Sequence, residues 1–334
     1  MNQFAKSSLV KSVVIAALFP LILTACNKKE EAAAPAATAA AKGAEDATCA
    51  TVKFADIGWT DITATTALSS TVLEGLGYKA EATIASVPIA FAGLKKGQID
   101  VFLGYWSPSM TPILDPFLKE KAVTVLDKPN LVGAKYTLAV PKYAYEAGLK
   151  SFADIGKFSK ELDGKIYGIE PGNDGNKLIA DMIAKDAFGL KSFKMVESSE
   201  AGMLTEVSRS VKDKKWIVFL GWAPHPMNVQ QDIVYLSGGD DFFGPNYGEA
   251  KVYTVTSNGL AKRCPNVNKL VSNLEFNVGM ENEVMLPIMD KKVPNEAAKE
   301  WLAKNPAVLD KWLDGVTTKD GQPGLDAVKK YLGV

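Results

Sequence analysis

The fold of this chain is decided by the stretch VKFADIGWTDITATTALSSTVLEGLG, residues 52–77. Its first six residues predict a strand, and residues 61–76 carry apolar side chains at helical spacing before a terminal glycine. The pattern then repeats, with a strand at 80–85, a helix at 88–96 and a strand at 99–103. Three strands with two intervening helices predict a βαβαβ unit with a parallel sheet, and ligands bind such sheets at the carboxyl ends of the strands.

The rest of the chain continues this α/β pattern and then becomes helical. No linker divides the residues after position 49, so two lobes would require the chain to cross between them more than once. Strands are predicted at 136–140, 165–169, 216–220 and 252–255, and helices at 151–155, 177–188, 200–212, 266–276, 280–290, 294–304, 306–313 and 323–332.

The composition excludes several classes of protein. Lys plus Arg and Asp plus Glu are each 38, so the formal net charge of zero offers no broad field to nucleic acid or an anionic membrane. One His and three Cys cannot build a zinc finger or a His-rich metal site. We find no nucleophile elbow, phosphate loop or dinucleotide fingerprint. The single His225 lies between two prolines, and we interpret it as structural. We therefore expect no catalytic residue, no metal and no cofactor.

The N-terminus resembles an export signal. Lys6 and Lys11 precede an apolar run over 13–23, which is short for a membrane span. The run ends in LTAC, similar to a bacterial lipobox, so we expect a signal peptide at 1–25 and a lipid on Cys26. The alternative is an ordinary secretory signal in which Cys26 has no special role. The Ala-rich residues 26–48 are interpreted as a tether.

Export implies an oxidising compartment, in which two cysteines remain for the folded part of the chain. Cys49 opens that part and Cys264 lies far along it. Because exported proteins rarely keep two free thiols, we expect a disulfide between them. The alternative is two unpaired thiols, since spacing alone cannot establish proximity.

A glycine closely followed by a Trp comes after three predicted strands, as Gly58-Trp59, Gly104-Tyr105-Trp106 and Gly221-Trp222. We interpret each as a tight glycine turn followed by a Trp on a loop. The alternative is that each Trp packs over the edge of the sheet, which is less attractive for three in parallel positions. Converging aromatic faces bind a quaternary ammonium group through cation–π attraction, at about 0.5–2 kcal/mol per ring. The contexts of the other tryptophans lack this turn, and we interpret them as core or helix-face residues: Trp216, Trp301 and Trp312.

The folded part of the chain resembles the periplasmic substrate-binding proteins of ABC transporters for choline, glycine betaine, proline betaine and carnitine, and is most similar to the choline-binding branch. The resemblance is carried by residues 56–65 (DIGWTDITAT), 101–108 (VFLGYWSP), 135–141 (KYTLAVP) and 221–228 (GWAPHPMN).

This resemblance implies an α/β, two-lobed periplasmic binding protein fold of type II, with the ligand cleft between the lobes and two hinge crossings. The first lobe would comprise 49–138 and 252–334, and the second 139–251. The resemblance also implies a monomer that delivers its ligand to a permease and ATPase. We expect it in the periplasm of a Gram-negative bacterium, with the N-terminal lipid as its membrane contact.

By resemblance, the ligand site is an aromatic box with two residues that hold the hydroxyl group of choline. Asp61 would also offset the positive charge of the ligand and repel the carboxylate of glycine betaine, which favours choline. The alternative for Asp61 is a helix N-cap, and for Asn173 a turn residue. The expected site residues are Trp59, Asp61, Trp106, Tyr136, Asn173 and Trp222.

Three functions follow from these observations. The first is an importer's binding protein for choline, or alternatively for glycine betaine, carnitine or another betaine. The second is an exported α/β hydrolase or transferase, for which the sequence offers no acid, base or nucleophile set. The third is a sensor or adhesion domain with the same fold.

Overall fold

A computed structural model of the chain describes residue 45 and residues 47–334. The predicted signal peptide at 1–25, the lipid on Cys26 and nearly all of the tether lie outside the described residues. Within the described residues, no helix combines the length and the apolar character that crossing a bilayer requires.

The N-terminal βαβαβ unit is confirmed. It consists of β1 (Thr51–Asp56), α1 (Thr60–Gly75), β2 (Lys79–Ile84), α2 (Val87–Lys95) and β3 (Val101–Ser107). β1 lies between β2 and β3 and pairs with both in parallel. The prediction of the unit succeeded because its helices and strands each follow from local periodicity.

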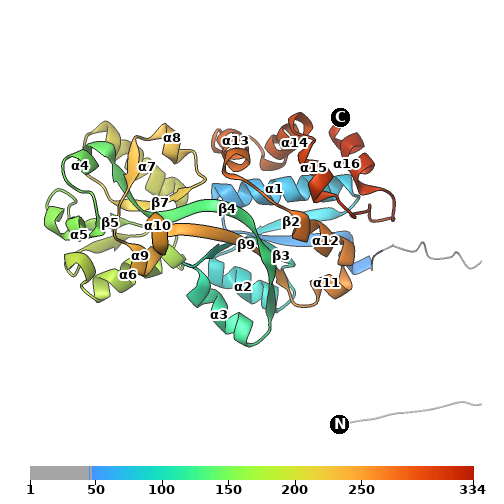
Figure 1. The fold of residues 1–334 in the computed structure, drawn as a ribbon, viewed down its shortest axis with the longest axis horizontal. Helices are drawn as coiled ribbons and strands as arrows, with labels where there is room; N and C mark the ends of the chain where they lie inside the picture. Colours follow the sequence, from blue (N-terminus) through green and yellow to red (C-terminus); the bar gives the residue numbers. More distant parts are fainter. Residues whose placement is uncertain (1–44, 46) are drawn as a thin grey trace, which may run out of the picture. The chain divides into compact units, whose positions relative to one another are not determined.

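Two long strands cross the molecule. β4 (Val123–Pro141) and β9 (Glu249–Ser257) pair antiparallel with each other, and β9 also pairs antiparallel with β3. Figure 1 shows both strands running from the side of β3 to the side of β7. The sheet is therefore mixed, not wholly parallel, and the strand predicted at 136–140 is only the end of a much longer one.

A second group of elements lies at the other end of β4. β7 (Phe219–Ala223) pairs antiparallel with β4 and parallel with β5 (Lys165–Tyr167), which in turn pairs with β6 (Lys194–Val196). β8 (Ile233–Tyr235) also pairs with β4. We call the group around β1–β3 the first lobe and the group around β5–β8 the second lobe; Figure 1 shows them on either side of the crossing strands.

The helices are divided between the two lobes (Figure 1). The C-terminal helices return to the first lobe, where α13, α14 and α16 pack against α1. Besides α1 and α2, the first lobe holds α3 (Thr111–Lys119), α11 (Leu260–Arg263), α12 (Pro265–Asn273), α13 (Val278–Met289), α14 (Pro294–Lys304), α15 (Val308–Trp312) and α16 (Gly324–Leu332). The second holds α4 (Lys142–Glu146), α5 (Phe152–Ile155), α6 (Asp174–Ala184), α7 (Glu200–Lys212), α8 (Met227–Gln230), α9 (Asp240–Phe243) and α10 (Pro245–Gly248).

Helix α1 is buried along most of its length although it is rich in Ser and Thr. Its buried hydroxyls donate to backbone carbonyls one turn earlier, as Ser69 does to Thr65 (2.8 Å) and Thr71 to Ala67 (2.8 Å). Because the hydroxyls of Ser69 and Thr71 find partners within the helix, these two residues can be buried without leaving a polar group unsatisfied. The buried hydroxyl of Thr66 is the exception, since it has no hydrogen-bond partner among the described residues. The small side chains let the surrounding helices pack closely around the helix that carries Asp61.

The predicted disulfide is confirmed. Cys49 and Cys264 are bonded, with their Cα atoms 5.6 Å apart across 215 residues of sequence. The bond ties the start of β1 to the turn before α12 within the first lobe. A cross-link over so long a segment restricts the unfolded chain strongly.

Candidate ligand-binding site

The turn between β1 and α1 places Trp59. The backbone N–H of Gly58 donates to Asp56 Oδ1 (2.7 Å), and Thr63 Oγ1 donates to Asp56 Oδ2 (2.9 Å). Gly58 has φ +82°, which glycine adopts at low cost, so the tight turn predicted here is confirmed. Trp59 occupies the N-cap position, and Asp61 is the second residue of the helix. The N-cap alternative for Asp61 is therefore wrong.

Trp106 and Trp222 lie within strands, not on loops. Trp106 is the last residue but one of β3, and Trp222 holds the same position in β7. The glycines before them make no turn. A Cβ on Gly104 would lie 2.5 Å from Ile62 Cδ1, so Gly104 allows helix α1 to pack against β3. The prediction of glycine turns here is wrong because pairing with β9 and β4 extends both strands past the glycines.

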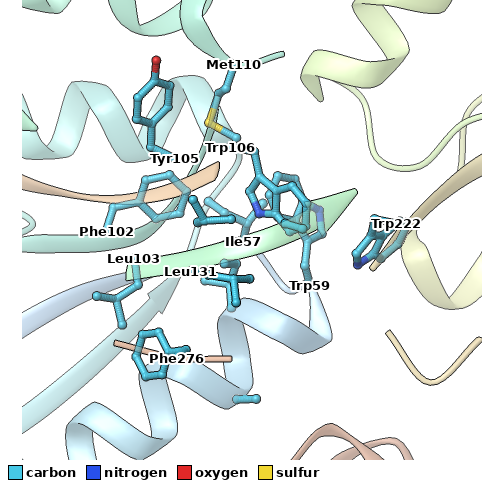
Figure 2. Close-up of a cluster of buried hydrophobic side chains, with 14 of the residues drawn as sticks. Ile57, Trp59, Phe102, Leu103, Tyr105, Trp106, Met110, Leu131, Trp222 and Phe276 are labelled. Atoms are coloured by element: carbon cyan, nitrogen blue, oxygen red, sulfur yellow. The ribbon is translucent and has the colours of Figure 1, made fainter. Parts of the chain in front are cut away.

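Strand register brings three of the rings together. Tyr136 on β4 lies directly opposite Trp222 on β7, and residues opposite each other in an antiparallel pair project from the same face of the sheet. The ring centroids of Tyr136 and Trp106 are 5.9 Å apart. The indoles of Trp59 and Trp106 lie together in Figure 2, with Trp222 facing them from the second-lobe side.

The amino terminus of α6 supplies two polar residues. Asn173 is its N-cap, since its side-chain oxygen accepts from the backbone N–H of Asn176 (3.0 Å). The same oxygen accepts from the hydroxyl of Tyr136 (3.0 Å). Gly175 permits this approach, because a Cβ there would lie 2.0 Å from the Tyr136 hydroxyl oxygen. Asn173 therefore stabilises the backbone at the start of α6, in line with the turn-residue alternative of the sequence analysis, and it also binds the hydroxyl of Tyr136.

All six predicted site residues line one cavity. Trp59 and Asp61 come from α1 and its turn, Trp106 from β3 and Tyr136 from β4, whereas Trp222 and Asn173 come from the second lobe. Two further residues complete the lining, Ile169 and Asp174. The sequence analysis missed both, although Asp174 directly follows Asn173 and Ile169 lies two residues after the end of β5.

Three polar atoms of the cavity are buried without a hydrogen-bond partner among the described residues. They are one carboxylate oxygen of Asp61, one of Asp174 and the indole Nε1 of Trp106. Buried polar groups normally have partners, and two acceptors and a donor left open in one cavity indicate a ligand with polar groups of its own.

The carboxylates around the cavity have raised pKa values. Burial raises the pKa of Asp61 well above its ordinary value, and the charges of Glu200 and Asp56 raise it further. Burial also raises the pKa of Asp174 to about 6 and that of Glu170 to about 7. A cluster of carboxylates held in such a site favours a cation as its occupant.

Hydrogen bonds from Trp59 and Thr60 cross the cleft between the lobes. The Trp59 indole N–H donates to Glu170 Oε1 (2.9 Å). The backbone N–H of Thr60 donates to Glu200 Oε2 (2.9 Å), and the Thr60 hydroxyl donates to Glu200 Oε1. Glu200, on α7 of the second lobe, thus caps helix α1 of the first lobe, whose own N-cap residue makes no side-chain capping bond.

His225 has the structural role expected of it. It is buried, and its Nδ1 accepts from the backbone N–H of Met227 (3.0 Å), so its Nε2 carries the proton and faces Glu200 Oε1 (3.2 Å). Its ring also lies 4.9 Å from that of Trp222. His225 therefore holds Glu200 in position, a link that no local sequence pattern reveals.

The other three tryptophans lie outside the cavity, as predicted. Trp312 is fully buried and donates to the backbone oxygen of Glu275 (3.2 Å). Trp301 donates to Glu283 (2.6 Å) on the neighbouring helix, and the ring of Trp216 packs against Phe158 at 5.0 Å.

Comparison with known proteins agrees with this geometry. The family profile described as the substrate binding domain of ABC-type glycine betaine transport system matches residues 50–304. An ABC-transporter choline-binding protein solved with choline is 54% identical, with a TM-score of 0.85 over 86% of this chain and 100% of that chain. The same coverage and identity hold for a choline-binding protein in an unliganded semi-closed conformation, with a TM-score of 0.78.

A third solved structure extends the likeness to betaine binders. Lactococcal OpuAC, in its closed conformation with glycine betaine, is 27% identical, with a TM-score of 0.71 over 78% of this chain and 98% of that chain. Between the two structures of choline-binding proteins, the TM-score shows that the present structure is more similar to the choline complex than to the unliganded semi-closed form.

Proposed function

The chain belongs to the family of substrate-binding domains of ABC-type glycine betaine transport systems, and from that premise we propose that it captures choline and delivers it to a permease and ATPase. The main observation behind the proposal is the cavity, which is lined by four aromatic rings and two carboxyl groups. Each carboxyl group has one buried oxygen without a hydrogen-bond partner among the described residues. The solved choline complex, at 54% identity, supports the same ligand. We also propose that the protein binds without turning its ligand over.

The cavity matches the chemistry of choline group by group. Trp59, Trp106, Tyr136 and Trp222 offer ring faces to a trimethylammonium group through cation–π attraction and burial of its methyl groups. The choline hydroxyl can donate to an open carboxylate oxygen and accept from a donor such as the Trp106 indole N–H.

Glycine betaine is the competing ligand, since the family profile and OpuAC both refer to it. Its carboxylate would enter a cavity that already contains the carboxylate of Asp174. Like charges in a buried site are costly, so we expect affinity in the order choline before glycine betaine.

Capture is proposed to involve closure of the lobes about β4 and β9. The expected lobe boundaries, 138/139 and 251/252, fall inside these strands, which connect the two groups of elements. The contacts of Trp59 with Glu170 and of Thr60 with Glu200 would form as the cleft closes.

We propose that the chain acts as a monomer in the periplasm, held at a membrane by a lipid on Cys26. The motif LTAC at 23–26 supports processing after residue 25. Mass spectrometry of the membrane fraction from a lipoprotein-processing host would detect a diacylated N-terminal Cys26. A protein that begins elsewhere, or that keeps its signal, would contradict the anchor.

Calorimetric titration of residues 49–334 tests the proposed ligand. We expect choline to bind with one site, glycine betaine and carnitine to bind more weakly, and acetylcholine to compete for the same site. Choline should remain chemically unchanged after prolonged incubation, as judged by NMR. If none of the four compounds binds or raises the melting temperature, the proposed function is wrong.

Affinity for choline is expected to fall as the pH decreases below about 8. In the empty cleft Glu170 and Asp174 titrate with pKa values of about 7 and about 6. A bound cation favours their ionised forms and lowers both pKa values, so binding at lower pH must release protons and becomes weaker. Above about pH 8, where both groups are ionised in the free protein, the affinity should be flat.

The measurement is titration at pH 5, 6, 7 and 8, repeated in buffers of different ionisation enthalpy to count released protons. The substitution Glu170→Gln should remove the part of the pH dependence of choline affinity that lies nearest pH 7. An affinity that is constant from pH 5 to pH 8, or that rises on acidification, would contradict the linkage.

A further inference from the structure

The cavity holds two carboxylates that come from opposite lobes. Asp61 comes from α1 and Asp174 from α6, and each keeps one buried oxygen without a partner among the described residues. Both side chains are almost fully buried, with residue exposures of 1% and 2%. The sequence analysis assigned the offset of the ligand's charge to Asp61, and the binding of its hydroxyl group to Asp61 together with Asn173.

The surroundings of Asp61 oppose its ionised form. The titratable groups that act on it are carboxylates, Asp56 and Glu200, and Asp61 in turn raises the pKa of the buried Glu281 on α13. Ionised Asp61 would therefore face the like charges of Glu200 and Asp56 in a site of low polarity. A neutral carboxyl group remains able to donate and to accept a hydrogen bond, which suits a hydroxyl partner.

The surroundings of Asp174 are different. It is the first residue of α6, where the backbone N–H groups of a helix stabilise negative charge. The Ser109 hydroxyl and the backbone amides of Asp174 and Gly175 favour its ionised form and partly offset the effect of burial. Its charge acts on Glu170, which is hydrogen-bonded to Trp59, and on Tyr136.

Asp174 is also placed beside the aromatic wall. Gly175, the next residue, lies against the Tyr136 hydroxyl, and Asn173, the residue before, accepts from it. The charge of Asp174 raises the pKa of Tyr136, after burial the largest influence on that group. A cation held against the Tyr136 ring would therefore lie within reach of the Asp174 charge.

We infer that Asp174 is the carboxylate that offsets the charge of a quaternary ammonium ligand, whereas Asp61 serves as the hydrogen-bond partner of the ligand's hydroxyl group. The inference rests on the proposed function and divides its recognition chemistry between two residues. It makes Asp174 a specificity-determining residue that selects cations over zwitterions.

The same isosteric change at the two positions tests this division. Choline carries a charge and a hydroxyl group, and tetramethylammonium carries the charge alone. Asp174→Asn should weaken both ligands by the same factor, about tenfold or more, because it removes a charge next to the ammonium group. Asp61→Asn should change both affinities less than threefold, because an amide retains a donor and an acceptor. Asp61→Ala should weaken choline about tenfold and spare tetramethylammonium.

Asp181→Asn, a carboxylate exposed on the same helix α6 and paired with Lys177, is the matched control and should leave both affinities unchanged. Asp174→Ser replaces Asp174→Asn if the latter lowers the melting temperature of the free protein. Two results would overturn this division of roles. One is an equal loss of affinity in Asp61→Asn and Asp174→Asn. The other is an Asp174 variant that binds tetramethylammonium within twofold of the unmodified protein. Failure of the unmodified protein to bind choline would instead refute the proposed function.

Discussion

Replacing both Trp106 and Trp222 by alanine is expected to lower the affinity for choline by about a thousandfold or more, because each desolvated ring contributes about 2 kcal/mol of cation–π attraction. The two indoles come from different lobes, on β3 and β7, so the double variant opens both sides of the cavity. Titration calorimetry and tryptophan fluorescence provide the affinity, and circular dichroism provides the fold.

Two further variants make this result specific to the box. Trp301→Ala removes an indole on α14 that bonds to Glu283 outside the cavity, and it should leave choline affinity unchanged. Trp222→Phe keeps an aromatic face and should recover part of the loss caused by Trp222→Ala. A folded double variant that still binds choline within tenfold would mean that the box is elsewhere.

Glu200→Gln is expected to weaken choline binding by about tenfold to a hundredfold without contacting the ligand, since hydrogen bonds to a charged group contribute about 1.5–3 kcal/mol each. Glu200 accepts from the backbone N–H and hydroxyl of Thr60 across the cleft and faces His225 Nε2 within its own lobe. In the glutamine variant, the side-chain NH₂ group would face either Thr60 or His225 Nε2, which are themselves hydrogen-bond donors, so one of the present bonds would be lost. Because the bonds to Thr60 belong to the closed arrangement, the effect should appear mainly as faster dissociation.

A double-mutant cycle with Thr60→Val separates this role from a general loss of stability. The two substitutions should be less than additive in their effect on choline affinity, as expected for residues that share one interaction. Glu206→Gln, on the exposed face of the same helix α7, is the control and should change neither affinity nor dissociation rate. Additive effects, or a Glu200→Gln variant that dissociates at the unmodified rate, would contradict a contact that holds the closed cleft.

Local pattern predicted the elements that depend on local interactions. The β1–α1–β2–α2–β3 unit and helices such as α7, found at Glu200–Lys212, arise from periodicity that neighbouring residues display by themselves. The lengths of β4 and β9 could not be read in this way, because strand ends depend on pairing with residues far along the chain. The same pairing explains why Trp106 and Trp222 lie in strands.

The same distinction between local and long-range interactions separates the site residues that were predicted from those that were missed. Its six expected members stood in short motifs, and the cavity contains all of them. Asp174 was missed although it follows Asn173 directly, because an aspartate at a helix start is usually a capping or surface residue. Only its burial and its open oxygen distinguish it. Glu200 stands in no recognisable motif, and its role depends on Thr60, 140 residues earlier in the chain.

The sequence by itself determined which chemistry this protein carries, namely aromatic rings with few charged partners on an α/β body. Residue type and local spacing are sufficient for that. The tertiary structure alone decided the electrostatic state of the site. Whether a carboxylate such as Asp61 or Asp174 ionises depends on burial and on the charges that folding brings next to it, and these neighbours come from distant segments of the chain.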